Sequence, residues 1–406
     1  MAVAIFGMNL PKLISLPGKP AIKNHICGST LKQLVPLSAA YICGKALRDP
    51  NKTRPPPYPY KEKNYKVLNS WFDKTTSRFD ENSKVIVVDG PIAAGKSTFA
   101  KALAEDLDML YIPPTTMDDF YINPYGYDMR QLDDKMPKSF KSYDDKNFCL
   151  DPKGLNSAFF QIMMYKLRYS TYIDALAHLL NTGQGVVLVR SCFSDFVFME
   201  ASFKEGYISK QARSVYNDLK KHTIYDLLKP HLCIYLDIPV AKVQENIKKR
   251  NLPHQVKGKA LTESFLTTFE DIYKRQFLKQ VSEQSELLIY DWSDGGDVEV
   301  VIEDLERLDF DQYTIYDAKL SGWRIKREQT WSDLRQQYTT YKHDLMTCFN
   351  VPRFDCPELI GSGEDEKTIE EVWFSAPGMK YDVGFNADQG DTGILLKNKV
   401  KKLLNI

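Results

Sequence analysis

The sequence has no uninterrupted apolar run as long as the eighteen or so residues that a membrane-spanning helix needs. Neither charge dominates, since 54 basic residues face 53 acidic ones, so no strong positive field calls for a nucleic-acid partner. The seven cysteines are odd in number and scattered, with no C-x-x-C pair. That pattern argues against both a disulfide framework and a zinc site.

Acidic residues are also missing from positions 1–48, although six basic residues occur there: Lys12, Lys19, Lys23, Lys32, Lys45 and Arg48. An acid-poor, positively charged N-terminus predicts a mitochondrial presequence. We place it at residues 1–50, and cleavage anywhere from about 25 to 50 is consistent with the charge pattern. Because arginine is scarce and prolines interrupt the helix, a disordered basic arm remains the alternative.

The segment 90–97, Gly-Pro-Ile-Ala-Ala-Gly-Lys-Ser, is a full match to the phosphate-binding motif G-x-x-x-x-G-K-[ST]. It follows the apolar run 85–88 and opens a helix-like stretch at 98–107, which is the context that the motif requires. In such a loop the backbone N–H groups, the helix N-terminus and the lysine hold phosphate, and the serine can ligate magnesium. The expected nucleotide-binding residues in this loop are Gly90, Ala93, Ala94, Gly95, Lys96, Ser97 and Thr98, with Ser97 as the metal ligand.

Short apolar runs alternate with long helical stretches from residue 85 onward. We expect strands at 85–88, 185–189, 232–236 and 287–290, and helices at about 155–182, 211–228, 240–250, 260–280 and 297–308. Continuous apolar strands separated by helices predict a parallel sheet covered on both faces. The fold class is therefore α/β, a doubly wound parallel sheet at residues 84–310 in which the motif at 90–97 forms the P-loop, with its ligand at the carboxyl ends of the strands.

An irregular segment flanks this domain on each side. Residues 51–83 include Arg-Pro-Pro-Pro-Tyr-Pro-Tyr at 54–60, which predicts an extended arm lying on the chain's own surface or on a partner's. Residues 311–406 mix aromatic and charged side chains, and only one good helix is expected there, near 328–346. We interpret them as a docking extension that packs on the α/β domain or wraps another protein.

From residue 85 to about 309 the order of motifs resembles the deoxyribonucleoside kinase family. The runs Asn-Thr-Gly-Gln-Gly-Val-Val-Leu at 181–188 and Phe-Ser-Asp-Phe-Val-Phe at 193–198, with Arg190-Ser191 between them, resemble in particular its kinase-like members that are accessory subunits of mitochondrial respiratory complex I. That resemblance implies other complex I subunits as partners. It also implies a place on the matrix side of the inner membrane, with membrane contact only through the complex.

The resemblance implies roles for several retained residues. Gln161 lies where the family's base-reading amide is expected, since an amide offers a donor and an acceptor together. Arg190 remains from an acid-Arg-Ser motif, and Glu200 lies where the sugar-binding acid is expected. Lys248 and Arg250 lie in a lid-like basic run that can approach phosphates. From the residues alone, an exposed helix face accounts equally well for Gln161 and Glu200, and a basic run of this kind is more often a solvated helix end.

Other parts of the family's machinery are absent. The family's proton acceptor is replaced by Pro-Pro-Thr-Thr at 113–116, and the nearest acids, Asp118 and Asp119, lie several residues further on. Val189 stands in place of the magnesium-side acid and can neither ligate a metal nor accept a hydrogen bond. Phe196 replaces the motif's second arginine. We therefore expect no catalytic residues, because a proton acceptor and charge stabilisation are what phosphoryl transfer requires.

The resemblance, together with these replacements, implies two alternative functions. The first is a non-catalytic accessory subunit of complex I that supports its assembly or stability and keeps a nucleotide-type pocket. The second is an active mitochondrial deoxyribonucleoside kinase with Asp118 or Asp119 as the base. The pocket suits a purine nucleotide and leaves magnesium binding open. FAD is credited to the family, but the glycine pattern lacks a dinucleotide fingerprint.

Overall fold

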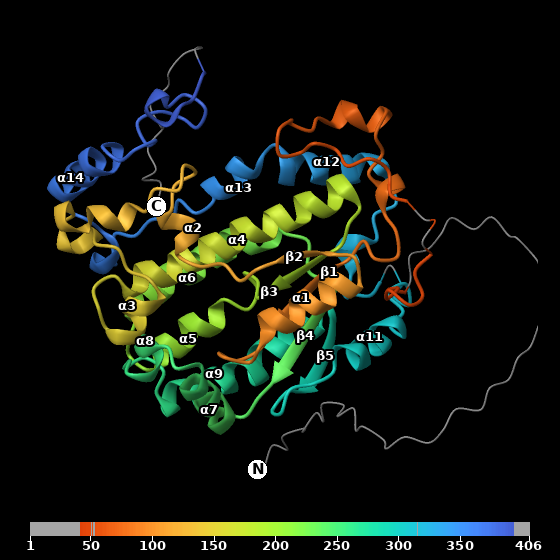
Figure 1. Cartoon of the computed structure of the whole chain (residues 1–406), viewed down its shortest axis with the longest axis horizontal. Coiled ribbons are helices and arrows are strands. Elements are labelled where there is room, and N and C mark those ends of the chain that lie inside the picture. The colour runs from red at the N-terminus through yellow and green to blue at the C-terminus, as the bar shows by residue number, and fades with distance from the viewer. Residues whose placement is uncertain (1–40, 50, 52, 315, 394–406) are drawn as a thin grey trace, which may run out of the picture. The chain divides into compact units, whose positions relative to one another are not determined.

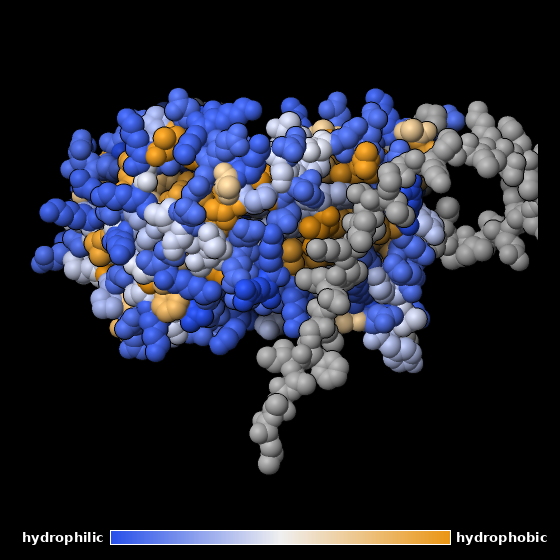
Figure 2. Space-filling model, turned by 90° about the horizontal axis from the view of Figure 1, so that it is seen from below, coloured by the Kyte–Doolittle hydropathy of each residue, from blue (hydrophilic) through white to orange (hydrophobic). Residues whose placement is uncertain are grey.

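The computed structural model describes residues 41–49, 51, 53–314 and 316–393, and these belong to one compact unit. Most of the predicted presequence and the last residues of the C-terminal extension lie outside the described part. No helix in the described ranges is long and apolar enough to cross a membrane. On the face shown in Figure 2, apolar side chains lie in separate patches between hydrophilic ones.

The core of the fold is a five-stranded sheet in the order β2-β3-β1-β4-β5, in which every pair is parallel (Figure 1). The strands are β1 (Val85–Asp89), β2 (Leu110–Ile112), β3 (Val186–Val189), β4 (Leu232–Asp237) and β5 (Glu286–Asp291). The predicted parallel α/β sheet is confirmed, and the four predicted strands lie where they were expected. β1 is central, so the loop that follows it leaves the middle of the sheet's carboxyl edge.

The helices lie in sequence between and after these strands. Their bounds are α1 (Lys96–Asp106), α2 (Asp118–Tyr121), α3 (Asp145–Leu150), α4 (Ser157–Thr182), α5 (Phe196–Lys204), α6 (Lys210–Thr223), α7 (Val240–Arg250), α8 (Pro253–Val256), α9 (Glu263–Ile272), α10 (Leu278–Ser282), α11 (Val298–Glu306), α12 (Glu328–Thr339), α13 (Lys342–Thr347) and α14 (Gly363–Phe374).

Alternation along β1 divides the core into two layers. Val85 and Val87 point into the layer that includes α4, α5 and α9, whereas Ile86 and Val88 point toward α1 and α11. Because side chains alternate, Asp89 at the end of β1 faces the first of these layers, where the P-loop begins.

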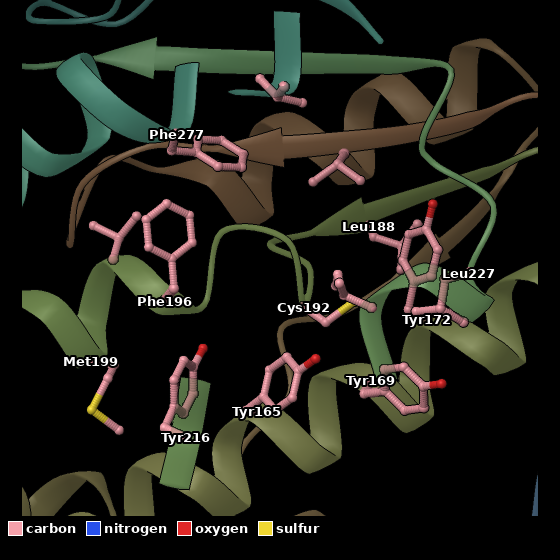
Figure 3. Packing of buried hydrophobic residues seen from close by; sticks show 14 of the residues in the cluster. Tyr165, Tyr169, Tyr172, Leu188, Cys192, Phe196, Met199, Tyr216, Leu227 and Phe277 are labelled. Carbon is pink, nitrogen blue, oxygen red and sulfur yellow. The ribbon is translucent and has the colours of Figure 1, made fainter. Parts of the chain in front are cut away.

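Tyrosines form one buried side of the long helix α4. Tyr165, Tyr169 and Tyr172 follow one another along α4, with the Tyr165 ring beside Cys192 and Tyr172 extending toward Leu188 of the sheet (Figure 3). Their hydroxyls stay hydrogen-bonded, for example that of Tyr172 to the carbonyl of Leu228 at 2.9 Å. The rings therefore fill the core while their polar ends remain satisfied.

Three helix predictions are wrong in detail. The stretch 211–228 leaves the α-helix at Thr223, whose hydroxyl bonds the Leu219 carbonyl at 2.8 Å and competes with the helical ladder. The stretch 260–280 is interrupted by a π-helical turn, η6 (Tyr273–Phe277), between α9 and α10. The stretch 328–346 is two helices, α12 and α13.

The expectation of a single good helix in the C-terminal extension is also wrong, because α14 follows. It begins at a Ser362 cap, whose hydroxyl accepts from the Asp365 N–H at 3.1 Å, and its first turn is acidic. Only Ile369 is buried along it. A helix held by its cap and charges gives little apolar periodicity, which explains why the pattern did not predict it.

The proline arm lies on the chain's own surface. The Tyr58 N–H bonds the carbonyl of Asn181 at the end of α4 at 3.1 Å, and the Tyr60 hydroxyl lies 3.0 Å from Nδ1 of His178. The C-terminal extension packs there too, because α12 contacts both α4 and the short helix η1 (Val67–Trp71) of the arm. Arm and extension are thus joined over one end of the α/β domain.

Arg335 of α12 is the centre of that junction and is fully buried. Its guanidinium pairs with Asp73 of the arm at 2.8 Å and donates to Oδ1 of Asn181 at 2.8 Å. The rings of Tyr65 and Tyr58 lie 3.9 and 5.2 Å from the guanidinium carbon. A single cation therefore links the arm, α4 and α12.

Candidate functional site

The P-loop backbone has the conformation that cradles a phosphate. Gly90 has φ +145°, and a Cβ there would lie 2.6 Å from the Leu236 carbonyl oxygen, so no other residue fits. Gly95 adopts φ +75° as the residue that precedes α1, and Ala93 is left-handed at φ 57°. Such turns point consecutive N–H groups inward, which makes an anion-binding concavity at the helix N-terminus.

Lys96 is buried in this loop and its ammonium donates to the Pro91 carbonyl. Burial holds its pKa well below the usual range, Arg190 lowers it further, and Asp89 opposes the shift. Arg250 and Arg168 act in the same direction as Arg190. The positive charges of Arg190, Arg250 and Arg168 therefore all disfavour the charged form of Lys96, and a bound phosphate would offset this repulsion. Ser97 and Thr98, by contrast, are exposed, where a ligand can reach them.

Arg190, predicted as a retained motif residue, is fixed against the P-loop. It donates to the Gly90 carbonyl at 3.0 Å and to the Tyr273 hydroxyl at 3.2 Å. Its guanidinium carbon lies 4.6 Å from the Phe198 ring centre, and its backbone is left-handed at φ 67°. A strained, fully oriented arginine at this place provides positive charge beside the loop.

Asp89 is a carboxylate of the site that the sequence pattern did not reveal. It is fully buried, and its Oδ1 accepts from the Tyr273 hydroxyl at 2.7 Å. Its other oxygen, Oδ2, has no hydrogen-bond partner among the described residues. The π-helical turn brings Tyr273 to this point, as such turns do at functional sites. The sequence feature that could have predicted its role is its position as the last residue of β1, directly before Gly90.

Gln161 also lies in a polar cluster that was only partly predicted. Its Nε2 donates to Oδ2 of the fully buried Asp195 at 3.0 Å. Arg168, seven residues further along α4, pairs with the same carboxylate, and the Tyr216 hydroxyl donates to it at 2.7 Å. The carboxylate thus fixes an amide and a guanidinium side by side. The spacing of Gln161 and Arg168 on one helix face was the signal that could have shown this pair.

The remaining predicted site residues have less direct relations to the loop. Glu200 forms an ion pair with Arg213 of α6 at 2.7 Å, so a contact with a sugar would require that pair to open. Lys248 and Arg250 are exposed at the end of α7. Of the two, Arg250 contributes to lowering the pKa of Lys96. α7 itself touches the loop through Asn246, whose amide donates to the Ala93 carbonyl at 3.3 Å.

Neither acid that was considered as a displaced proton acceptor is free. Asp118 pairs with Arg130 at 2.7 Å, and Asp119 accepts from the Thr116 N–H at 2.9 Å. Both start the short helix α2, beyond the end of β2 at Ile112. A base role for either would require its present interaction to break.

The two other replaced positions are filled by apolar packing. Val189 is buried and pairs in register with Val88 of β1. Phe196 is buried, and the Lys220 ammonium lies 3.8 Å from its ring centre. In the described ranges, no three His, Cys, Asp or Glu side chains are grouped to hold a metal. A magnesium ion would here depend on the Ser97 hydroxyl and on phosphate oxygens, as the loop type allows.

A mainly apolar cavity lies elsewhere. It has a volume of about 230 Å³ and is bounded by the segment around α2 and the start of α4 on one side and by residues 353–374 on the other. None of its lining side chains belongs to the P-loop. This cavity is therefore separate from the nucleotide-type site.

Proton uptake on anion binding tests the charge arrangement at Lys96. A bound phosphate should raise the depressed pKa of Lys96 toward its usual value of 10.5, so binding should take up protons at pH values between the two. Calorimetry of nucleotide binding in buffers of different ionisation enthalpy measures this uptake. Lys96→Met should abolish it, and binding without buffer dependence in the unaltered protein would contradict the arrangement.

Comparison with known proteins decides the family. The deoxynucleoside kinase family model matches residues 86–317, more than half of the sequence. The chain belongs to the deoxynucleoside kinase family. Rat NADH dehydrogenase [ubiquinone] 1 alpha subcomplex subunit 10, mitochondrial, is 37% identical over 330 residues, which cover 80% of this chain and 87% of that protein. The resemblance in the sequence to this group is thereby confirmed.

A kinase of the family shows lower sequence identity. Deoxyguanosine kinase of Dictyostelium discoideum is 25% identical over 270 residues, covering 66% of this chain and 85% of the kinase. The solved structure of deoxyadenosine kinase from M. mycoides with bound dATP superposes with a TM-score of 0.41 at 18% identity, covering 54% of this chain and 96% of that one. This deoxynucleoside kinase family member is thus more similar in sequence to the rat respiratory-chain subunit than to the Dictyostelium kinase.

Proposed function

We propose that this chain is a non-catalytic accessory subunit of mitochondrial respiratory complex I, located on the matrix side of the inner membrane, where it supports assembly or stability. Its similarity to alpha subcomplex subunit 10 of rat carries this proposal, because the alignment extends over 330 residues, well beyond the kinase match at 86–317. The other subunits of the complex are its proposed partners.

Its pocket, we propose, binds a purine nucleotide without phosphorylating a nucleoside. The loop glycines, Lys96 and Arg190 support nucleotide binding, because holding phosphate with these groups does not require the carboxylates that the chain has replaced. The absence of phosphoryl transfer is supported by Val189 and by the prolines at 113 and 114, which stand where the family has its magnesium-side acid and its proton acceptor. General-base assistance is commonly worth about 10²–10⁴-fold, and charge stabilisation at least as much. Their combined absence removes several kcal/mol of transition-state stabilisation.

Complementation in cells that lack the chain tests the subunit role. The full chain should restore the amount of intact complex I on native gels and comigrate with it. A chain that accumulates in mitochondria as a free monomer, while complex I stays deficient, would contradict the proposal. Lys96→Met should restore the complex as well if the nucleotide only stabilises the fold by mass action.

The alternative is an active deoxyribonucleoside kinase, and Asp89 is the observation that favours it. This acid is buried beside the P-loop and has one oxygen without a partner in the described part of the chain. Turnover that is abolished by Asp89→Asn as well as by Lys96→Met would establish this function. Asp118→Asn should have no such effect, because that acid is engaged with Arg130.

A further inference from the structure

Three large apolar side chains are exposed together on the proline arm. Leu68, Trp71 and Phe72 are 67%, 78% and 94% exposed, and all belong to η1 or follow it directly. We call these three residues the arm tip, which lies in the orange segment above α12 in Figure 1. Isolated apolar residues on a surface are ordinary, but such a cluster with a tryptophan is typical of a binding surface.

The arm tip is held in this exposed position by the fold. The Val67 N–H donates to the side chain of Gln336 on α12 at 3.2 Å, and the Asn69 amide donates to the Tyr58 hydroxyl at 3.3 Å. The Asn69 carbonyl accepts from the N–H groups of the two residues at 72 and 73, at 3.1 and 2.9 Å. Asp73, which follows Phe72 in the chain, forms the ion pair with the buried Arg335 and so connects the arm tip to that junction. The exposure is therefore preorganised, which lowers the entropic cost of binding.

Positive charge flanks the arm tip in the chain. Four exposed lysines lie within residues 61–74, at positions 61, 63, 66 and 74. Glu62 is the only exposed acid in that stretch, since Asp73 is paired with Arg78 and Arg335. A partner surface complementary to this one has an apolar pocket with an acidic rim.

The segments that build the arm tip lie outside the kinase match. Both η1 and its support on α12 fall beyond residues 86–317. The alignment with the rat respiratory-chain subunit is longer than that match, and its name places it in a protein assembly. These observations favour a protein partner over a lipid surface.

We propose that the arm tip docks this chain onto a partner protein that offers an apolar pocket rimmed by acidic side chains. This inference rests on the proposed subunit function and names the surface through which it is exerted. The tip residues act as anchors, and the lysines orient the encounter and make it sensitive to salt.

Double substitution of the tip provides the first test. Trp71→Ser with Phe72→Ser, expressed in cells lacking the chain, should reduce the fraction that comigrates with complex I at least tenfold. The matched control is Phe354→Ser, which removes an aromatic ring that is 88% exposed elsewhere, and it should comigrate like the unaltered chain. Thermal unfolding and nucleotide binding of the purified variants should match the unaltered protein, which separates docking from folding.

A photo-crosslinker at Leu68 of the full chain in intact mitochondria identifies what covers the tip. We expect one discrete protein adduct that disappears when Lys66→Glu and Lys74→Glu are combined. Adducts with lipid only, or no adduct, would overturn the inference. Comigration of the tip variant at the unaltered level would also overturn it while leaving the subunit role intact. If the unaltered chain does not comigrate with complex I but still gives a protein adduct, the proposed complex I membership is wrong and the docking role of the arm tip stands.

Discussion

Replacing Arg335 by methionine should lower the free energy of unfolding by about 3–5 kcal/mol, the usual cost of removing one partner of a buried ion pair. The substitution leaves Asn181 and Asp73 without their shared donor and removes the contacts with Tyr65 and Tyr58. Urea denaturation followed by circular dichroism measures the change. Because this cation joins the arm and α12 to α4, we expect the arm to become protease-sensitive first.

Arg307→Met is the matched control for this loss. Arg307 is 72% exposed in its side chain and pairs with Glu303 and Asp304 on the surface of α11, so its loss should cost less than about 1 kcal/mol. Adding Asp73→Asn to Arg335→Met should cost less than the sum of the two single changes, because the pair is already broken. Equal, small effects of both arginine substitutions would show that the buried junction does not hold the arm.

Lys96→Met should weaken nucleotide binding by about 10- to 150-fold, the range expected for losing hydrogen bonds from a charged donor. The unliganded protein should become no less stable. Burial and Arg190 depress the pKa of Lys96 in the folded state, so the unfolded chain binds this proton more tightly. At pH values below the usual lysine pKa of 10.5, Lys96 therefore lowers the free energy of unfolding. Differential scanning fluorimetry with and without ATP measures both effects: the ATP-induced rise in Tm should become smaller, and the Tm without ATP should be unchanged or higher.

Lys101→Met serves as the control for Lys96→Met, since Lys101 is an exposed lysine on the same helix. It should keep the full ligand shift. A Lys96→Met protein that shows the same ATP-induced shift as the unaltered protein would mean that the nucleotide does not bind at the P-loop.

Features that depend on local pattern could be predicted from the sequence. The P-loop is a contiguous motif with a defined backbone, so the roles of Gly90, Gly95 and Lys96 follow directly from the order of residues. The strands were predictable because buried parallel strands are short continuous apolar runs. α7 was predicted to the residue, since polar and apolar positions alternate clearly along it.

The rest depends on contacts between distant residues. Arg335 and Asp73 are 262 positions apart, and neither has a local pattern that indicates a buried ion pair. Asp195 meets Gln161 only because α5 packs beside α4. Tyr273 reaches Asp89 through a π-helical turn, which no periodicity predicts. The apolar character of the arm tip was visible in the sequence, but its exposure was not.

Phosphoryl transfer by the purified chain tests the central claim most directly. With ATP, magnesium and each deoxynucleoside, the protein should bind ATP with a Lys96-dependent affinity and yet release no nucleoside monophosphate above the level of Lys96→Met. Nucleoside-dependent turnover that Lys96→Met and Asp89→Asn both abolish would show that Asp89 has taken over the chemistry, and that this family member is still a kinase.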